Sequence, residues 1–370
     1  MDNNQFMGSN DQRRVFAERI ASKIGRERSE AISDRMIRAL ERVPREEIVL
    51  GGRFSVADPE EIYTDSVLVV RKDNRGEAVS TVSQPSLVVR MLELLDLQLG
   101  QKVLEIGAGS GYNAALIAEL VGDPGLVTTV EIDSELARST AGVLASVGYG
   151  GIKVVAGDGW EGAGDSGPFD RIEVTLAAPG ISRHWVEQIV EGGVAVVPVE
   201  HGGPGAAPLF RLIGQRDTMR GQATYWTRFV SMRGRSASSP WPDPPSVRRG
   251  RPDTTIPLTG VESVSEATRP WSSFAFFLII SESGSWVENR IGIRSESGSA
   301  VIEDGVVEGW GDEEPASRLA ACFRKWVDLG CPELTEWDIT FGSGRGAPPN
   351  GGFLIWREDS WEWAVLRSDS

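Results

Sequence analysis

The chain has few of the side chains that form disulfide frameworks or hold metal ions. Its 370 residues include two cysteines, Cys322 and Cys331, and two histidines, His184 and His201. No Cys-x-x-Cys motif is present, so we expect two buried or half-buried free thiols. The cysteines and histidines follow no familiar spacing of metal ligands. The sequence therefore predicts no metal site.

Targeting and membrane-spanning signals are also lacking. The first five residues are polar, unlike the basic and apolar start of a signal peptide. The longest strongly apolar run, 274–280, is too short to cross a bilayer. The net charge of −15 argues against binding to a phosphate backbone. We therefore expect a cytoplasmic protein with neither a nucleic-acid nor a membrane partner.

The patterns that are present predict a globular α/β protein. Hydrophobic residues make up 40% and charged residues 25% of the chain, and its length suits two domains. Two amphipathic helices are expected within 11–43 and another at 86–97. An alternation of strands and helices follows, which is typical of parallel strands with crossover helices. We expect strands at 102–106, 127–131, 152–155, 170–175 and 193–198, helices at 112–121, 134–147 and 182–190, and a closing antiparallel pair at 210–213 and 223–232.

The composition changes after residue 234. Residues 235–257 are rich in proline, serine and arginine, which predicts a linker. A small α+β domain is expected at 258–370, with a helix at 316–329 and strands at 274–280, 286–294, 299–308, 336–341, 353–357 and 361–366. Its tryptophans either form the core or are partly exposed to grip a peptide. They are Trp271, Trp286, Trp310, Trp326, Trp337, Trp356, Trp361 and Trp363.

The most informative segment is 103–112, Val-Leu-Glu-Ile-Gly-Ala-Gly-Ser-Gly-Tyr. It predicts a strand, a glycine-rich turn and the start of a helix, so that the backbone can approach a ligand closely. Glu131 ends the next predicted strand and lies 20 residues after Gly111. That spacing allows an acid to reach a ribose diol. A cofactor that contains a nucleoside is therefore the first hypothesis.

The spacing of the glycines favours one cofactor over another. A dinucleotide fingerprint counted from Gly107 needs glycine at position 112, where this chain has Tyr112. A Gly-x-Gly-x-Gly turn with Glu105 two residues before it resembles class I S-adenosylmethionine-dependent methyltransferases instead. Farther along, Asp158 could accept a hydrogen bond from an adenine amino group, and Trp160 could cover the ring. A simple tight turn is the alternative there.

Further segments resemble the protein-L-isoaspartate (D-aspartate) O-methyltransferase family over roughly residues 15–234. The most specific is 81–85, Thr-Val-Ser-Gln-Pro, because general methyltransferases lack it. The other similar segments, in the family's order, are 103–112, 157–160, 169–170, 174–179, 192–193, 197–199 and 229–232. Three features depart from the family's pattern. A longer loop at 67–78 replaces a shorter segment, Leu176 replaces a small residue, and the pattern does not account for 235–370.

The resemblance implies a class I Rossmann-like methyltransferase domain at 1–234, in which 1–80 supplies helices and a substrate-side loop. It implies a mostly parallel sheet with helices on both faces, with S-adenosyl-L-methionine as cofactor. The implied cofactor-binding residues are Glu105, Gly107, Gly109, Ser110, Gly111, Glu131, Ile132, Asp158, Gly159 and Trp160. The implied catalytic residues are Ser83, Thr81 and Asp65, and the implied substrate-binding residues are Val82, Gln84, Thr175 and Ala177.

Within this set, Ser83 is expected to align the substrate carboxylate. The alternative is that Ser83 is the N-cap of the helix that begins near Pro85. An aspartyl or isoaspartyl carboxylate is ionised at neutral pH, since its pKa is ~4, so methyl transfer needs no general base. Positioning would then be the main source of catalysis.

The extension beyond residue 234 resembles that of methyltransferases that accompany ribosomally made peptides such as lanthipeptides, lasso peptides and graspetides. This subfamily methylates a specific aspartate of a precursor peptide, and the ester can close to an aspartimide and open to isoaspartate. Two hypotheses compete with such peptide tailoring. One is a general isoaspartate repair enzyme with an accessory domain, and the other is a non-catalytic peptide-binding module.

Overall fold

The contacts within the chain divide it into two compact units. The computed structural model describes residues 8–28, 31–51, 59–72, 76, 78–203, 205–234, 251–259, 270–287, 290–343, 352–356 and 360–366. The first unit comprises 1–175, 187–196 and 233–235, and the second comprises 176–186, 197–232 and 236–370. These limits differ from the predicted domains, because strands that precede residue 234 share a sheet with strands near the carboxyl end. The domain limits proposed from the sequence stay a prediction.

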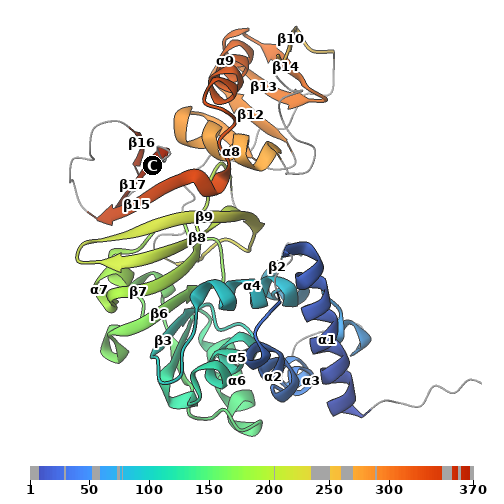
Figure 1. Ribbon diagram of the computed structural model, residues 1–370, viewed down its shortest axis with the longest axis vertical. Helices are drawn as coiled ribbons and strands as arrows, with labels where there is room; N and C mark the ends of the chain where they lie inside the picture. Colours follow the sequence, from blue (N-terminus) through green and yellow to red (C-terminus); the bar gives the residue numbers. More distant parts are fainter. Residues whose placement is uncertain are drawn as a thin grey trace, which may run out of the picture. The chain divides into compact units, whose positions relative to one another are not determined.

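The first unit is built around parallel strands in the order β7-β6-β3-β4-β5. Figure 1 labels β7, β6 and β3 of this set. Each neighbouring pair is parallel, as the predicted alternation requires. The strands are β3 (Val103–Ile106), β4 (Val127–Glu131), β5 (Lys153–Ala156), β6 (Phe169–Val174) and β7 (Ile189–Pro198), of which 189–196 belong to this unit. The helices along this stretch of chain are α4 (Pro85–Leu95), α5 (Tyr112–Val121), α6 (Ser134–Ser146) and α7 (Arg183–Gln188), of which only the last two residues of α7 belong to this unit.

The amino-terminal part of this unit contains helices and a hairpin. The two predicted helices are α1 (Ser9–Arg28) and α2 (Asp34–Arg42), and a third, α3 (Arg45–Gly51), was not predicted. After the 3₁₀ turn Pro59–Tyr63, strands β1 (Leu68–Lys72) and β2 (Ala78–Val82) form an antiparallel pair. The stretch 67–78, predicted as a loop, therefore contains β1 and the first residue of β2.

The described residues of the second unit form two sets of antiparallel strands, together with helices that pack among them. One set has the strand order β8-β9-β15-β17-β16, and the other is a five-stranded sheet with the order β10-β14-β13-β12-β11. The first contains β8 (Ala206–Gln215), β9 (Thr218–Arg228), β15 (Trp337–Ser343), β16 (Phe353–Trp356) and β17 (Ser360–Leu366). The second contains β10 (Thr254–Pro257), β11 (Ser285–Val287), β12 (Ile291–Arg294), β13 (Gly298–Glu303) and β14 (Val306–Gly311). The helices are α8 (Pro270–Ser281) and α9 (Glu314–Asp328).

Three predictions for this unit were wrong. The predicted single strand 286–294 is two strands, β11 and β12, which pair antiparallel with Trp286 opposite Gly292. The run 274–280 is helical, within α8, and not a strand. All seven of its side chains are buried, and a fully buried apolar run has no periodicity that separates a helix from a strand. The predicted single strand 299–308 is the hairpin β13–β14. Its turn residues Asp304 and Gly305 both have positive φ, 46° and 77°, as a tight Asp-Gly hairpin turn requires.

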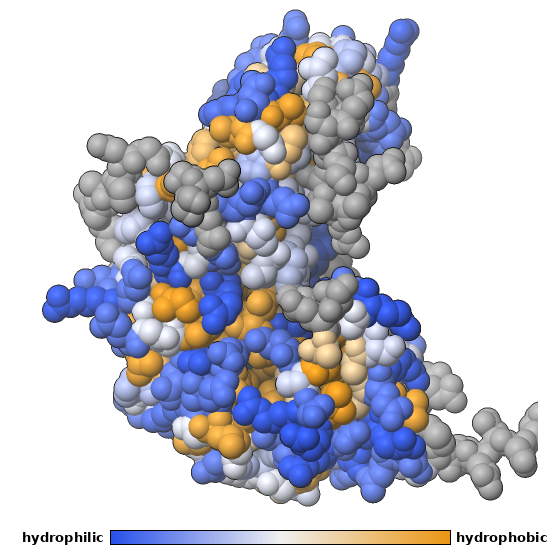
Figure 2. Space-filling view, viewed as in Figure 1, coloured by the Kyte–Doolittle hydropathy of each residue, from blue (hydrophilic) through white to orange (hydrophobic). Residues whose placement is uncertain are grey.

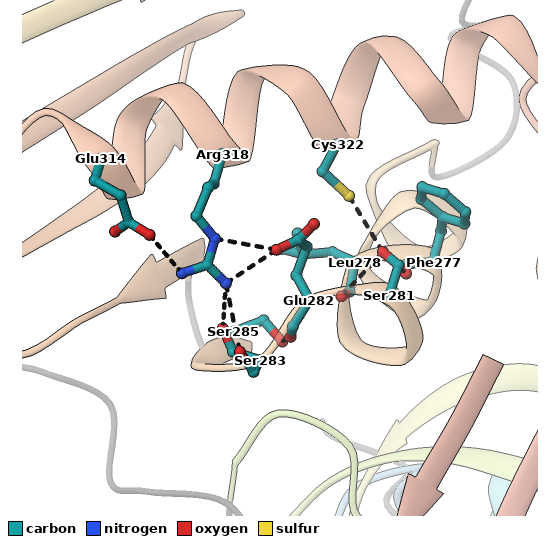
Figure 3. Close-up of polar contacts among 9 residues, drawn as sticks. All are labelled: Phe277, Leu278, Ser281, Glu282, Ser283, Ser285, Glu314, Arg318 and Cys322. Atoms are coloured by element: carbon teal, nitrogen blue, oxygen red, sulfur yellow. Dashed lines mark hydrogen bonds and ion pairs between the residues drawn. The ribbon is translucent and has the colours of Figure 1, made fainter.

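Helices α8 and α9 are joined by a polar cluster around Arg318 (Figure 3). The guanidinium of Arg318 donates to Glu282 at 3.0 and 3.1 Å, to Glu314 at 2.9 Å and to the carbonyl of Ser283 at 2.9 Å. Burial lowers the pKa of Arg318, but the two carboxylates outweigh it and raise the pKa above its usual value. Beside them, the buried Cys322 thiol lies 3.3 Å from the Ser281 hydroxyl, and burial raises its pKa to about 11.

Most of the tryptophans in the second unit form its core. Trp286, Trp310, Trp326, Trp337 and Trp361 are all buried, which confirms the core interpretation for these five. Trp271, in contrast, is 36% exposed. On the face shown in Figure 2, hydrophilic residues cover most of the surface and apolar residues lie between them in small groups. No described helix is long and apolar enough to cross a membrane.

Candidate active site

One pocket of the first unit brings predicted substrate and cofactor residues together. It has a volume of about 460 Å³, including its opening to solvent, and lies between β2, α4 and the glycine turn after β3. From the predicted substrate side it is lined by Thr81, Val82, Ser83 and Thr175, and from the predicted cofactor side by Gly107, Gly109 and Ser110. Its other lining residues are Val88, Met91, Ala108, Tyr112, Asn113 and Glu173, none of which was predicted as a site residue.

The glycine turn adopts the backbone that its sequence predicted. Gly107, Gly109 and Gly111 have φ values of 100°, 50° and 87°, a region that other residues rarely adopt. A Cβ atom at Gly111 would lie 2.9 Å from the Thr140 side chain, so α6 packs directly against the turn. The Thr140 hydroxyl also donates to the Gly109 carbonyl at 2.6 Å. The turn is therefore held in a shape that exposes backbone to the pocket.

Glu131 lies directly beside this turn, at the end of β4. Its carboxylate accepts hydrogen bonds from the backbone N–H groups of Gly109 and Asp133, both at 3.1 Å. The next residue, Ile132, is 38% exposed. An acid and an exposed apolar residue at the carboxyl end of a parallel strand suit a ribose and an adjoining base.

Asp158 begins the 3₁₀ turn Gly159–Glu161. Its carboxylate accepts a hydrogen bond from the backbone N–H of Trp160 at 3.0 Å, so a tight turn is present. Gly159 packs against Ile106, since a Cβ atom there would lie 2.5 Å from the Ile106 side chain. Gly234 lies against the same carboxylate, where a Cβ atom would be 2.4 Å from Asp158 Oδ2. The predicted adenine contacts of Asp158, Gly159 and Trp160 stay a prediction.

Asp65 and Gln84 do not line the pocket but organise its edge. The Asp65 carboxylate accepts hydrogen bonds from the backbone N–H of Ser86 at 2.8 Å and from the Gln84 side chain at 3.1 Å, and it pairs with Lys23. Burial raises the pKa of Asp65, but these three donors outweigh it and hold the pKa below its usual value. Asp65 is thus a positioning residue at the start of α4.

The position of Asp65 decides between the two interpretations of Ser83. The N-cap of α4 is Gln84 and Pro85 is its first residue, so the N-cap interpretation of Ser83 was wrong. Asp65 provides the cap from another segment instead. The Ser83 hydroxyl lines the pocket and has no hydrogen-bond partner among the residues that the structure describes. It is therefore available to a ligand.

A buried polar cluster lies at the base of the pocket. Glu105 was predicted as a cofactor-binding residue but is not among the lining residues, whereas Asn113 and Glu173 line the pocket and were not predicted. Glu105 on β3 and Glu173 on β6 are 0% and 1% exposed, and the Asn113 amide donates to both, at 2.7 and 2.8 Å. Burial raises the pKa of Glu105 to about 7, although hydrogen bonds from Thr129 and Asn113 lower it in part. Burial likewise raises the pKa of Glu173 to about 8. A signal was available, because Glu173 is an acid inside an otherwise apolar part of a predicted strand.

Two predicted substrate residues have structural roles. Thr175 lines the pocket, and its hydroxyl lies 3.0 Å from the Ile106 carbonyl and 2.9 Å from that of Gly107. Ala177 is buried and forms an isolated bridge with Ser231. It is not among the lining residues of the pocket.

Comparison with known proteins agrees with this geometry. The family model described as protein-L-isoaspartate(D-aspartate) O-methyltransferase matches residues 20–237. The chain belongs to this family. Protein-L-isoaspartate O-methyltransferase 1 of Archaeoglobus fulgidus is 35% identical over 63% of this chain and 99% of its own length. The corresponding protein of Methanothermobacter thermautotrophicus is 43% identical over 47% of this chain and 75% of its own length.

Membership of the O-methyltransferase family makes the chain an enzyme whose cofactor is S-adenosyl-L-methionine. A solved structure described as a protein-L-isoaspartate O-methyltransferase has a similar fold, with a TM-score of 0.56 and 24% identity over 89% of this chain and 96% of that chain. Residues beyond 234 make up more than a third of the chain, so this match includes a large part of them. The extension therefore does not by itself set the chain apart from the family in fold, contrary to the expectation from its sequence.

The second unit contains a larger cavity of its own, with a volume of about 1120 Å³ including space open to solvent. Two tryptophans and several aliphatic side chains line it together with charged residues, of which Arg290 and Glu303 form an ion pair at 3.0 Å. The full lining is Trp226, Arg228, Trp271, Ser272, Ala275, Val287, Arg290, Ile291, Ile302, Glu303 and Asp304.

Proposed function

We propose that the enzyme transfers a methyl group from S-adenosyl-L-methionine to an isoaspartyl or aspartyl carboxylate of a peptide bound at Thr81, Val82 and Ser83. The observation that carries this proposal is the pocket lined by both the glycine turn and an unengaged Ser83 hydroxyl. The residues present suit the cofactor. The turn offers close-approaching backbone, and Glu131 and Ile132 lie at the adjoining strand end.

The chemistry in this pocket depends on positioning. Bound S-adenosyl-L-methionine supplies a methyl group on a positively charged sulfur. The substrate carboxylate needs no deprotonation, since its pKa is ~4. In our proposal the Ser83 hydroxyl donates to one carboxylate oxygen and directs the other toward the methyl group. Holding two reacting groups in line in this way can contribute about 7–11 kcal/mol to lowering a barrier.

The relatives support general isoaspartate repair as the substrate class. One archaeal protein named for this activity is matched over 99% of its length, and a solved structure of the same description over 96%. In this function any protein with an exposed isoaspartyl residue is a substrate. The second unit would then be an accessory part of a repair enzyme.

Two observations favour peptide tailoring as a second candidate. Strand β1, in the stretch that departs from the family's pattern, pairs along β2, whose residues Thr81 and Val82 line the pocket. The cavity of the second unit presents Trp226 and the half-exposed Trp271, and such rings often dominate peptide recognition. In this function the enzyme methylates one aspartate of a ribosomally made precursor, and the ester closes to an aspartimide.

A transfer assay with radiolabelled S-adenosyl-L-methionine separates the candidates. The substrates are an unrelated isoaspartyl peptide, the same peptide with normal aspartate, and a modified precursor peptide from the same gene cluster. Methylation of the isoaspartyl peptide alone supports repair and rejects tailoring. Methylation of the precursor alone does the opposite. No transfer to any of the three peptides, with S-adenosyl-L-homocysteine binding intact, rejects both candidate substrate classes.

A further inference from the structure

Two buried carboxyl groups lie side by side at the base of the pocket. Glu105 and Glu173 occupy paired register positions on the neighbouring parallel strands β3 and β6. The Nδ2 group of Asn113 donates one hydrogen to each, at 2.7 and 2.8 Å. The Thr129 hydroxyl also donates to Glu105. The hydrogen bonds that hold Glu105, Asn113 and Glu173 therefore come from four elements, β3, β4, β6 and α5.

No described residue supplies a positive charge to this cluster. The register partner of Glu173 on β7 is Val196, and α4 contributes Val88 and Met91 to the pocket lining. The titratable group outside the cluster that affects the pKa of Glu105 is Glu131, whose negative charge raises it. A buried carboxylate without a cation is costly. The cluster must therefore hold a proton or meet a cation that comes from a ligand.

Only part of the cluster reaches the pocket. Glu173 and Asn113 are lining residues, whereas Glu105 is not. Because Nδ2 of Asn113 serves both carboxyl groups, its Oδ1 must face elsewhere, and this buried oxygen has no partner among the described residues. The base of the pocket thus offers a carboxylate and an amide oxygen. Both are acceptors, which suits a group with several donors, such as an ammonium ion.

We propose that Glu173 and Asn113 bind the α-ammonium group of the cofactor's methionine end, and that the Glu105–Asn113–Glu173 cluster releases a proton to solvent when the cofactor binds. The ammonium nitrogen keeps its three hydrogens and donates them, while the cluster loses the proton that it held when empty. This inference depends on the cofactor of the family and not on which peptide is methylated.

The direction of the pH dependence follows from the cluster. Burial raises the pKa of Glu173 to about 8 and that of Glu105 to about 7, so near neutral pH the empty cluster holds a proton. The ammonium group binds best to the deprotonated form. Affinity should therefore increase as the pH rises through this range and level off above it.

Isothermal titration calorimetry with two ligands tests the proposal without turnover. S-Adenosyl-L-homocysteine carries the ammonium group, and 5′-methylthioadenosine lacks the whole amino-acid part. We expect Glu173→Gln to weaken S-adenosyl-L-homocysteine roughly tenfold to a hundredfold near pH 8 and to leave 5′-methylthioadenosine unchanged. Glu191→Gln, which neutralises an exposed acid on β7, should change neither ligand.

The wild-type enzyme gives an independent test. Titration of S-adenosyl-L-homocysteine in two buffers of different ionisation enthalpy should show proton release near pH 7, and this release should be lost in Glu173→Gln. Equal weakening of both ligands in the variant would mean that Glu173 only maintains the pocket and would overturn the proposal. Wild-type binding without proton release would also overturn it, whether or not the variant folds.

Discussion

The Asp65 carboxylate accepts a hydrogen bond from the backbone N–H of Ser86 at 2.8 Å. Asp65 is 21 residues away in sequence, yet it caps α4 where no side chain of the N-cap residue does so. The cap allows the neighbouring Ser83 to lie in the pocket with an unengaged hydroxyl. The resemblance implied that both Asp65 and Ser83 are catalytic. In the structure Asp65 positions the start of α4, and Ser83 lines the pocket.

Replacement of Asp65 should reduce both stability and transfer. Asp65→Ala leaves backbone donors of α4 without a cap and should lower the free energy of unfolding by about 1 kcal/mol. Methyl transfer should fall because Ser83 and β2 lose their alignment, while S-adenosyl-L-homocysteine affinity stays. Asp123→Ala is a matched control, because Asp123 caps the 3₁₀ turn Pro124–Leu126 through Gly125 at 2.8 Å, and no residue of that turn lines the pocket. Unchanged transfer in Asp65→Ala would contradict the positioning role.

Ser83→Ala should separate transfer from folding and cofactor binding. The hydroxyl has no partner among the described residues, so its removal should leave the melting temperature unchanged. Transfer to an isoaspartyl peptide should fall roughly tenfold to a hundredfold, as expected when a reacting group loses alignment. Ser80→Ala removes a nearby hydroxyl on β2 that does not line the pocket and should keep full activity. A loss of S-adenosyl-L-homocysteine affinity in Ser83→Ala would instead place Ser83 at the cofactor.

The sequence predicted the parts of this enzyme that follow from local chemistry. The glycine turn at 107–111 could be predicted because backbone with positive φ favours glycine. Helix α5 follows the turn with the predicted bounds 112–121. The Glu105–Asn113–Glu173 cluster could not be predicted from the sequence, because it depends on the register between β3 and β6. The helix at 274–280 could not be predicted either. All of its side chains are buried, so its sequence lacks the alternation of apolar and polar residues that distinguishes a helix from a strand.

The cavity of the second unit leads to a prediction about long substrates. Trp271→Ala should remove aromatic surface from this cavity, since the ring is 36% exposed there. If a precursor peptide is the substrate, its kcat/KM should fall about tenfold through KM, whereas a short isoaspartyl peptide should be methylated normally. Leu329→Ala, which truncates an exposed residue just after α9, is the control. An equal loss with both peptides would point to damaged packing against Phe274 and Phe323, which Trp271 contacts.

A buried pair ties the last strand to the part of the chain that the family model matches. His201 Nδ1 lies 2.9 Å from the Val199 carbonyl, and its Nε2 lies 2.8 Å from Glu362 on β17. His201 and Glu362 are both fully buried. Because a carbonyl only accepts, Nδ1 carries a hydrogen, and the other ring nitrogen shares a proton with the Glu362 carboxyl group. Phe210 and Phe341 add a ring contact between β8 and β15.

Removal of Glu362 should therefore destabilise the second unit. We expect Glu362→Ala to lower the free energy of unfolding in urea by about 1–3 kcal/mol, because it removes one side of a fully buried hydrogen bond. Glu362→Gln keeps the volume and one hydrogen bond and should cost less. Truncation after residue 234 should be worse than either, since β9 loses its pairing with β15. A truncated chain that folds with the wild-type melting temperature would show that the extension is an independent domain, as the sequence predicted.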